Sequence, residues 1–199
     1  MKRSRAKSTD EYSGYLEHPR YGRAPRITGI NPSDAKYSED VFFHWHSREG
    51  VRIPNTAIVA NIDKQAPATI HVTHYFDSRR VCRKCGAHFI FFAREQRYWY
   101  EDLGFPLESD LVDCINCRRH EHRLRKSRQE YERLLKKEER SAEDTLSMIE
   151  NGVYLVEENI FSKKLLSKLR GFIYALTSIP EGKAQELLNR MATLDKNDS

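Results

Sequence analysis

Apolar positions follow two different periods along this chain of 199 residues. Between residues 27 and 92 they form short runs and alternations that predict strands, at 41–45, 56–62, 69–76 and 88–92. From residue 118 onwards they recur every three or four positions, which is typical of amphipathic helices. The two periods predict an α+β fold with a β-rich first part and a helical second part.

The helical part contains three predicted elements. One stripe predicts a long helix from residue 118 to about 150, ended by Asn151 and Gly152. A second helix is expected at about 158–178, and after Pro180 a third apolar face runs from Leu187 to Leu194. These helices either close a small bundle or expose a face to another protein or to a second copy of the chain. The stripe of the long helix consists of Leu124, Tyr131, Leu135, Ala142, Leu146 and Ile149.

All four cysteines occur in two C-x-x-C pairs, Cys82 with Cys85 and Cys114 with Cys117. Two turns of this kind supply the tetrahedral all-sulfur ligand set of a Zn²⁺ site. Redox dithiols or four unrelated thiols are the alternatives, but two pairs with no spare cysteine favour a metal. A closed four-cysteine site has no open position for water, so we expect one structural zinc ion and no catalysis at it.

The segment between the pairs is longer than the roughly 15 to 20 residues of a compact ribbon, so it has structure of its own. We expect a short helix at 93–103, with Gly104 as its left-handed end and Pro106 preventing continuation. The basic neighbours of the cysteines are expected to offset the negative charge of the thiolates. They are Arg83, Lys84, Arg118 and Arg119.

An ordered set of motifs accompanies the cysteines: Cys82 to Phe92, then Glu95-Gln96, Trp99-Tyr100, Gly104-Phe105 and finally Cys114 to Arg118. It resembles the bacterial "probable zinc-ribbon" family, which shares C-x-x-C-G, a short aromatic strand, E-Q, an aromatic-Tyr pair, Gly-Phe and C-x-x-C-R. Residues 21–77 also resemble the lead-in of longer members. The resemblance implies a zinc site and no established reaction.

The net charge of +5 is unevenly distributed. Residues 1–26 carry seven Lys/Arg against three acids, and residues 118–140 carry ten against five. Basic segments favour a polyanion such as RNA or DNA, although a charged helix can simply be solvated. The candidate phosphate contacts share one helical face: Arg119, Arg123, Lys126 and Arg133. In the first segment, tyrosines alternate with arginines, which either stack on single-stranded nucleic acid or pack onto the domain.

Four histidines lie between residues 27 and 77, His44 with His46 and His71 with His74. Neighbouring imidazoles can transfer protons, so a hydrolytic enzyme is the third and least favoured hypothesis. No acidic cluster stands at a matching spacing, and structural histidines are the preferred interpretation.

The chain therefore divides into a basic, flexible arm (1–26), a β-rich zinc-ribbon domain (27–117), a helical region (118–195) and a tail (196–199). No apolar run approaches 18 residues, so no membrane span is expected, and cysteines in metal spacing fit the reducing cytoplasm. We expect a binding module for nucleic acid or a nucleoprotein particle. The alternative is a protein-interaction adaptor that acts, or self-associates, through its C-terminal helices.

Overall fold

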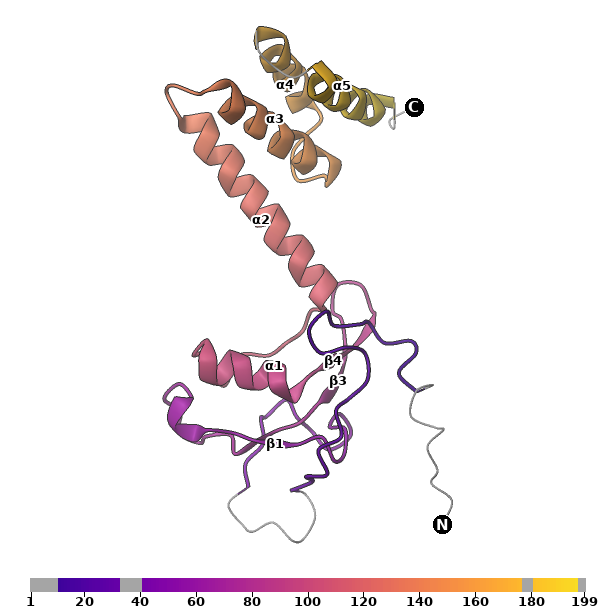
Figure 1. Cartoon of the computed structure of the whole chain (residues 1–199), viewed down its shortest axis with the longest axis vertical. Helices are drawn as coiled ribbons and strands as arrows, with labels where there is room; N and C mark the ends of the chain where they lie inside the picture. Colours follow the sequence, from indigo (N-terminus) through magenta and orange to yellow (C-terminus); the bar gives the residue numbers. More distant parts are fainter. Residues whose placement is uncertain (1–10, 33–40, 177–180, 197–199) are drawn as a thin grey trace. The chain divides into compact units, whose positions relative to one another are not determined.

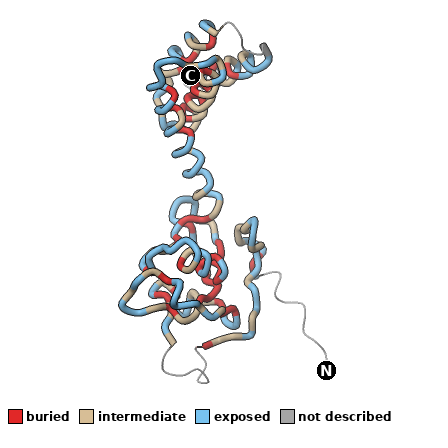
Figure 2. Tube along the Cα trace, turned by 60° about the vertical axis from the view of Figure 1, so that its left-hand side comes forward, coloured by how far each residue is buried: buried red, intermediate tan, exposed pale blue. Residues whose placement is uncertain are grey.

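The computed structural model describes residues 11–32, 41–176 and 181–196. The chain divides into two compact units, one ending at Arg118 and the other beginning at Arg119. Buried residues gather separately within each unit (Figure 2). Three parts of the expected organisation lie outside the described residues: positions 1–10 of the arm, the segment 177–180 around Pro180, and the last three tail positions.

Unit 1 contains two antiparallel strand pairs (Figure 1). The strands β1 (Ile58–Val59) and β2 (His74–Tyr75) form one pair, and β3 (Ser78–Val81) and β4 (His88–Phe91) form the other. The strands expected at 56–62 and 69–76 are therefore short, and the one expected at 88–92 is present. Segment 41–45 is not a strand: only Phe43 bridges to His74, because the chain turns at Trp45 and His46.

The sequence did not predict β3. Its residues Ser-Arg-Arg-Val show no apolar alternation, yet all four pair with β4, from Ser78 opposite Phe91 to Val81 opposite His88. Strand pairing depends here on the partner strand, which is almost wholly apolar and buried.

The helix expected at 93–103 consists of two parts. A regular helix, α1 (Ala93–Arg97), is followed directly by a π-helical turn, η2 (Tyr98–Asp102). Gly104 follows with a φ of 64°, the left-handed conformation that the sequence predicted for it. A short 3₁₀ turn, η1 (Ile62–Lys64), contacts η2.

Residues 11–26 are not a free arm. Tyr12 is buried in a cluster with Ile53, Ile90 and Phe92. The backbone N–H of Leu16 donates to the carbonyl of His88 at 2.8 Å, which attaches this segment to the edge of β4. The tyrosines of this segment therefore pack onto the domain, which is one of the two alternatives that the sequence allowed. Packing removes the apolar area of their rings from water.

Unit 2 is helical, but the single long helix that the sequence predicted from residue 118 to about 150 is wrong, because two helices occupy this stretch. The helix α2 (Ile115–Lys136), which begins in unit 1, ends fourteen residues before the expected stop, and α3 (Ala142–Glu157) starts anew. Ser141 caps α3: its side chain accepts from the Asp144 N–H, and Asp144 accepts from the Ser141 N–H. This capping box satisfies backbone N–H donors that have no partner within the first turn of a helix, and so it stabilises the start of a second helix at this position.

Gly152 does not end a helix. It lies within α3, where it permits close packing against α2 and α4 (Lys164–Ala175). The last helix is α5 (Glu181–Lys196). The core of unit 2 is formed by all four helices, and Leu134, not the expected Leu135, is the buried member near the end of α2. Its fully buried side chains include Leu134, Met148, Ile149, Leu155, Leu166, Leu169 and Met191. Within the described part of the chain, no helix is long and apolar enough to span a bilayer.

Candidate metal centre

The first cysteine pair occupies the turn that joins β3 to β4. Cys82 is buried directly after β3, and Cys85 is exposed at the tip. The Gly86 N–H donates to the Cys82 carbonyl at 2.9 Å, and Gly86 has a φ of 71°. A side chain would be strained in that conformation, so glycine allows the tight turn that brings the two sulfurs together.

The second pair is built differently from the first. Cys114 lies just before α2, and Cys117 lies in the first turn of that helix. The spacing predicted a second turn of the same kind as the first, and that prediction is wrong. The positive end of the helix dipole favours thiolates at this position. The Cys114 N–H donates to Sγ of Cys82 at 3.3 Å, which links the two pairs.

The four sulfurs fit a tetrahedral zinc ion. Their Sγ atoms all lie within 4.8 Å of one another, and Cys85 Sγ is 3.8 Å from Cys114 Sγ. A tetrahedron with Zn–S bonds of about 2.3 Å has edges of about 3.8 Å. None of the four forms a disulfide. Among the residues that the structure describes, no other group of three or more His, Cys, Asp or Glu side chains is close enough to hold a metal.

The backbone prepares Cys82 for the metal. Burial raises the pKa of its thiol, but N–H groups of Cys114, Cys85 and Lys84 stabilise the thiolate and lower the pKa to about 6. A thiolate is the form that binds zinc, so these donors act as an outer shell for the site.

Arg118 has a different role from the one expected. Instead of offsetting the thiolate charge, its guanidinium donates to Glu95 Oε1 at 2.7 Å and stacks on Trp99, 5.4 Å from the ring centre. Glu95 has a side chain only 6% exposed and also faces His18. A buried carboxylate requires such partners, and the pair ties α1 to the start of α2 and to the N-terminal segment.

Two further polar side chains hold the strands around the site. Gln96 donates through Nε2 to the carbonyls of Phe76, at 2.5 Å, and Phe91, at 3.0 Å. Asp77 accepts the Ala93 N–H at Oδ1, at 2.6 Å, and the Arg26 N–H at Oδ2, at 2.9 Å. Burial raises the pKa of Asp77 to about 6, although both backbone donors oppose the shift.

The histidines do not form a metal site. His44 is buried, stacks on His46, and its Nε2 lies 3.0 Å from the hydroxyl of Tyr100. His46 Nδ1 lies 3.1 Å from Asp110, which also accepts from Arg80 at 3.0 Å. The sequence did not indicate a role for Asp110, because its partner His46 is far away in the chain. His71 lines a pocket of about 380 Å³ with His44, and His74 contacts Thr73.

The four proposed phosphate contacts of α2 are all exposed, but two are engaged. Arg133 donates twice to Glu130, at 2.7 and 2.8 Å. Arg123 lies over the Tyr154 ring, 4.4 Å from its centre, and keeps its charge. Arg119 and Lys126 form no ion pair with a residue that the structure describes.

The architecture around the cysteines defines a class: a zinc-binding domain in which one cysteine pair lies in a β-turn and the other at the start of a helix. In agreement, residues 76–126 match a family model described as "Probable treble clef domain". The match confirms the resemblance to a probable zinc-binding family over this segment. Neither the curated proteins nor the solved structures compared with the chain include a match.

Proposed function

We propose that this protein binds nucleic acid in the reducing cytoplasm, with zinc as a structural ion and the basic face of α2 as the phosphate-binding surface. The observation that supports the proposal is the distribution of charge along α2. Residues 118–128 carry six Lys/Arg and one acid, Glu121. Arg119, Arg123 and Lys126 share an exposed face that flanks the buried stripe of Ser127, Tyr131 and Leu134.

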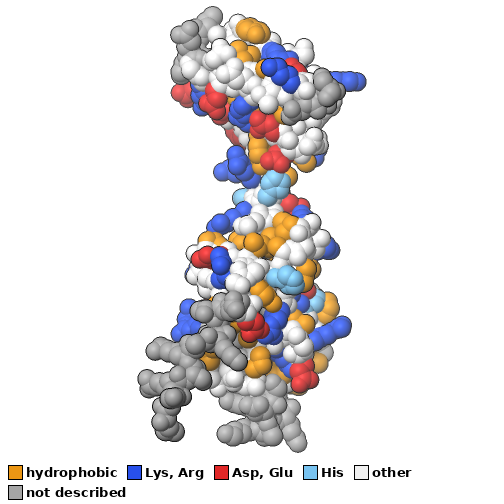
Figure 3. Space-filling view, turned by 90° about the vertical axis from the view of Figure 1, so that its right-hand side faces the viewer, with side chains coloured by type: hydrophobic (Ala, Val, Ile, Leu, Met, Phe, Trp, Pro, Cys, Tyr) orange, Lys and Arg blue, Asp and Glu red, His pale blue; other side chains and the backbone are white. Residues whose placement is uncertain are grey.

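The active part of this face is its N-terminal half. Glu130 stands on the same face and binds Arg133, so the charge there is locally neutralised. Figure 3 likewise shows acidic and basic side chains interspersed on the face of unit 2 that it displays. Binding therefore depends on a three-residue cluster and not on the net charge of the whole helix.

The test is the salt dependence of binding to RNA and DNA. Changing Arg119, Arg123 and Lys126 to glutamine removes three phosphate contacts, and each contributes about −0.9 to the slope of log K against log salt on duplex DNA and about −0.7 on single strands. We expect the slope to flatten by roughly 2 to 3. Zinc content stays the same, because none of the three is a ligand.

Two controls separate this face from net charge. Arg125→Gln, Lys136→Gln and Lys164→Gln remove the same total charge from other exposed positions of unit 2. Arg133→Gln removes a side chain already bound to Glu130. Affinities and slopes should stay near those of the unchanged protein in both controls, and equal losses in all variants would refute the assigned face.

A second candidate is an adaptor function of unit 2. Tyr131, Phe161 and Leu165 line an open apolar groove of about 460 Å³, with Lys164 and Lys168 at its edge, and Ile160 nearby is 44% exposed. Exposed apolar grooves of this kind mark protein interfaces. Recovery of the same partner protein with and without nuclease, or a concentration-dependent dimer in light scattering, would favour this function over the first.

A further inference from the structure

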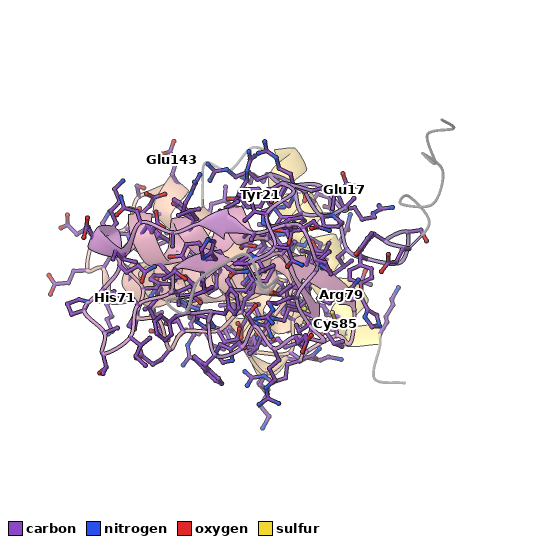
Figure 4. The ribbon with its side chains drawn as sticks, turned by 90° about the horizontal axis from the view of Figure 1, so that it is seen from below. Glu17, Tyr21, His71, Arg79, Cys85 and Glu143 are labelled. Atoms are coloured by element: carbon purple, nitrogen blue, oxygen red, sulfur yellow. The ribbon has the colours of Figure 1, made fainter. Side chains whose placement is uncertain are left out.

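Three arginines, two from the N-terminal segment and one from α1, line one small cavity of unit 1. Arg20, Arg26 and Arg94 line a cavity of about 100 Å³, together with the hydroxyl-bearing residues Tyr21 and Thr28. Tyr21 is labelled in Figure 4, in the N-terminal segment. Arg94 comes from α1, on the far side of both strand pairs in the sequence. None of the three arginines forms an ion pair with another residue that the structure describes.

One of the arginines is held in place before any ligand binds. The guanidinium of Arg20 lies 5.6 Å from the ring centre of Tyr21 and 5.5 Å from that of Tyr98. Contact with two aromatic rings restricts a long side chain that otherwise loses rotamer entropy when it is ordered by a ligand. A ligand at this cavity therefore meets a partly preorganised cation.

The lining is positive overall. The one acid in it is Asp77, whose two oxygens both accept backbone N–H groups, so neither is a free acceptor directed at a ligand. With Asp77 ionised, three arginines against one carboxylate leave a formal charge of +2. Arginine forks match the oxygens of phosphate, and roughly 300 to 1,000 Å³ is typical of cavities for larger organic ligands. The cavity therefore suits a compact anion.

The surroundings favour a phosphate that belongs to a strand with unpaired bases. Tyr98 is 38% exposed beside Arg20, and a tyrosine ring at that position can stack on a neighbouring base. In a duplex the bases already stack on one another, so this ring would find no partner. An aromatic surface beside a phosphate site is the usual arrangement of single-strand binding proteins.

We propose that the cavity between Arg20, Arg26 and Arg94 binds one phosphate group of single-stranded nucleic acid, with Tyr98 stacking on the adjacent base. The inference rests on the proposed function, which it extends from α2 to a second, defined contact in unit 1. It names the chemical class of ligand: a flexible single strand with phosphodiesters, as opposed to a rigid duplex.

The experiment measures fluorescence anisotropy of a labelled single-stranded oligonucleotide with the zinc-loaded full chain. Arg26→Gln combined with Arg94→Gln should weaken binding at least about tenfold, because charge-assisted hydrogen bonds to the phosphate are lost. Arg48→Gln combined with Lys64→Gln removes equal charge from other exposed positions of unit 1 and should leave the affinity unchanged. Equal zinc content and thermal midpoint in both variants show that the fold is intact.

A second variant tests the stacking contact. Tyr98→Leu should weaken single-strand binding while affinity for a duplex of the same sequence stays the same. Tighter binding of the duplex than of the single strand by the unchanged protein would overturn the proposal. So would binding of inorganic phosphate at the cavity without any effect of the arginine substitutions on oligonucleotide affinity, since the source would then be free phosphate.

The outcome also separates this inference from the proposed function. If the α2 substitutions weaken binding and the cavity substitutions do not, the cavity is refuted and α2 stands. If the cavity substitutions alone weaken binding, the cavity is supported and the α2 face is refuted. If the unchanged protein binds no nucleic acid, both fail together.

Discussion

His44 illustrates how the fold fixes the chemistry of one side chain. The Tyr100 hydroxyl donates to the Ser109 carbonyl at 2.6 Å, so it must accept from His44, whose Nε2 therefore carries the proton. The backbone N–H of His46 points at Nδ1 from 3.4 Å. A second proton on the ring would have to bind Nδ1 and would point at that N–H, which disfavours the protonated imidazole. Burial, and then the neighbouring His46, lower the pKa of His44 from 6.5 to about 4.

This shift predicts a pH-dependent stability. The unfolded chain takes up a proton on His44 near pH 6.5, whereas the folded chain does so only near pH 4, so the free energy of unfolding falls as the pH drops between these values. The total loss is about 3 kcal/mol. In His44→Gln the amide can still donate to Tyr100 but cannot be protonated, so we expect its stability to depend less steeply on pH.

Denaturant titrations from pH 7 to pH 4 check this prediction. Both proteins lose zinc-bound thiolates as acid is added, so the difference between them isolates His44. A direct control is the NMR titration of the imidazole. Identical pH profiles for the two proteins, or a His44 that titrates near 6.5, would contradict the assignment.

The residues that carry the family resemblance also have individual roles at this scale. Glu95 binds Arg118, so the E-Q motif and the arginine after the last cysteine are two ends of one ion pair. Gln96 satisfies the carbonyls of Phe76 and Phe91. Phe105 packs edge-on against Trp99 at 5.3 Å. These motifs stabilise the frame of the zinc site and do not themselves indicate a reaction.

At the scale of elements, the helices of unit 2 depend on close packing at one glycine. A Cβ built on Gly152 would lie 3.0 Å from Leu169 Cδ1 and 3.1 Å from Tyr131 Cε2, and both of these side chains are buried. The glycine in α3 therefore lowers local helix propensity but lets α2 and α4 approach.

We expect Gly152→Ala to lower stability despite the better helix propensity of alanine. Overpacking costs about 1 to 3 kcal/mol, against a gain of about 1 kcal/mol from propensity. Gly171→Ala is the matched control, because Gly171 lies in α4 with nothing within 4 Å of its added Cβ. It should gain about 0.5 to 1 kcal/mol. Thermal unfolding of unit 2 measures both effects. If Gly152→Ala raises the thermal midpoint, Leu169 and Tyr131 can move to make room for the methyl group, and the expectation is wrong.

At the scale of the whole molecule, the metal and the helical core belong to different units. The cysteines lie in unit 1, and the buried core formed by α3, α4, α5 and the C-terminal part of α2 lies in unit 2. Structural zinc sites supply about 10 to 16 kcal/mol of apparent folding free energy. Unit 1 should therefore need the metal, while unit 2 has an apolar core of its own.

Cys114→Ser is expected to release zinc and unfold unit 1 while most helical circular dichroism remains. Elemental analysis of the unchanged protein should give close to one zinc per chain. Hydrogen exchange locates the loss: amides of β3, β4 and α1 should become unprotected, and those of α3 should not. Loss of helicity together with zinc would mean that the units fold as one.

The sequence by itself determined the features that depend on neighbouring residues. The change of apolar period near residue 118 predicted the order of β-rich and helical parts, and the cysteine spacing predicted the four metal ligands that the structure brings together. The sequence also contained a signal for the break between α2 and α3, since Ser141 and Asp144 have the three-residue spacing of a capping box. The apolar stripe concealed it, because a stripe can continue across two packed helices.

Only the tertiary structure decided what distant residues do together. The pairing of β3 required the apolar partner β4, and the engagement of Arg118 by Glu95 required α1 to lie beside the start of α2. Arg94 meets Arg20 and Arg26 at one cavity although both strand pairs lie between them in the chain. Local patterns reflect local hydrogen bonding and the burial of one face, whereas ion pairs and cavities depend on the path of the backbone between their members.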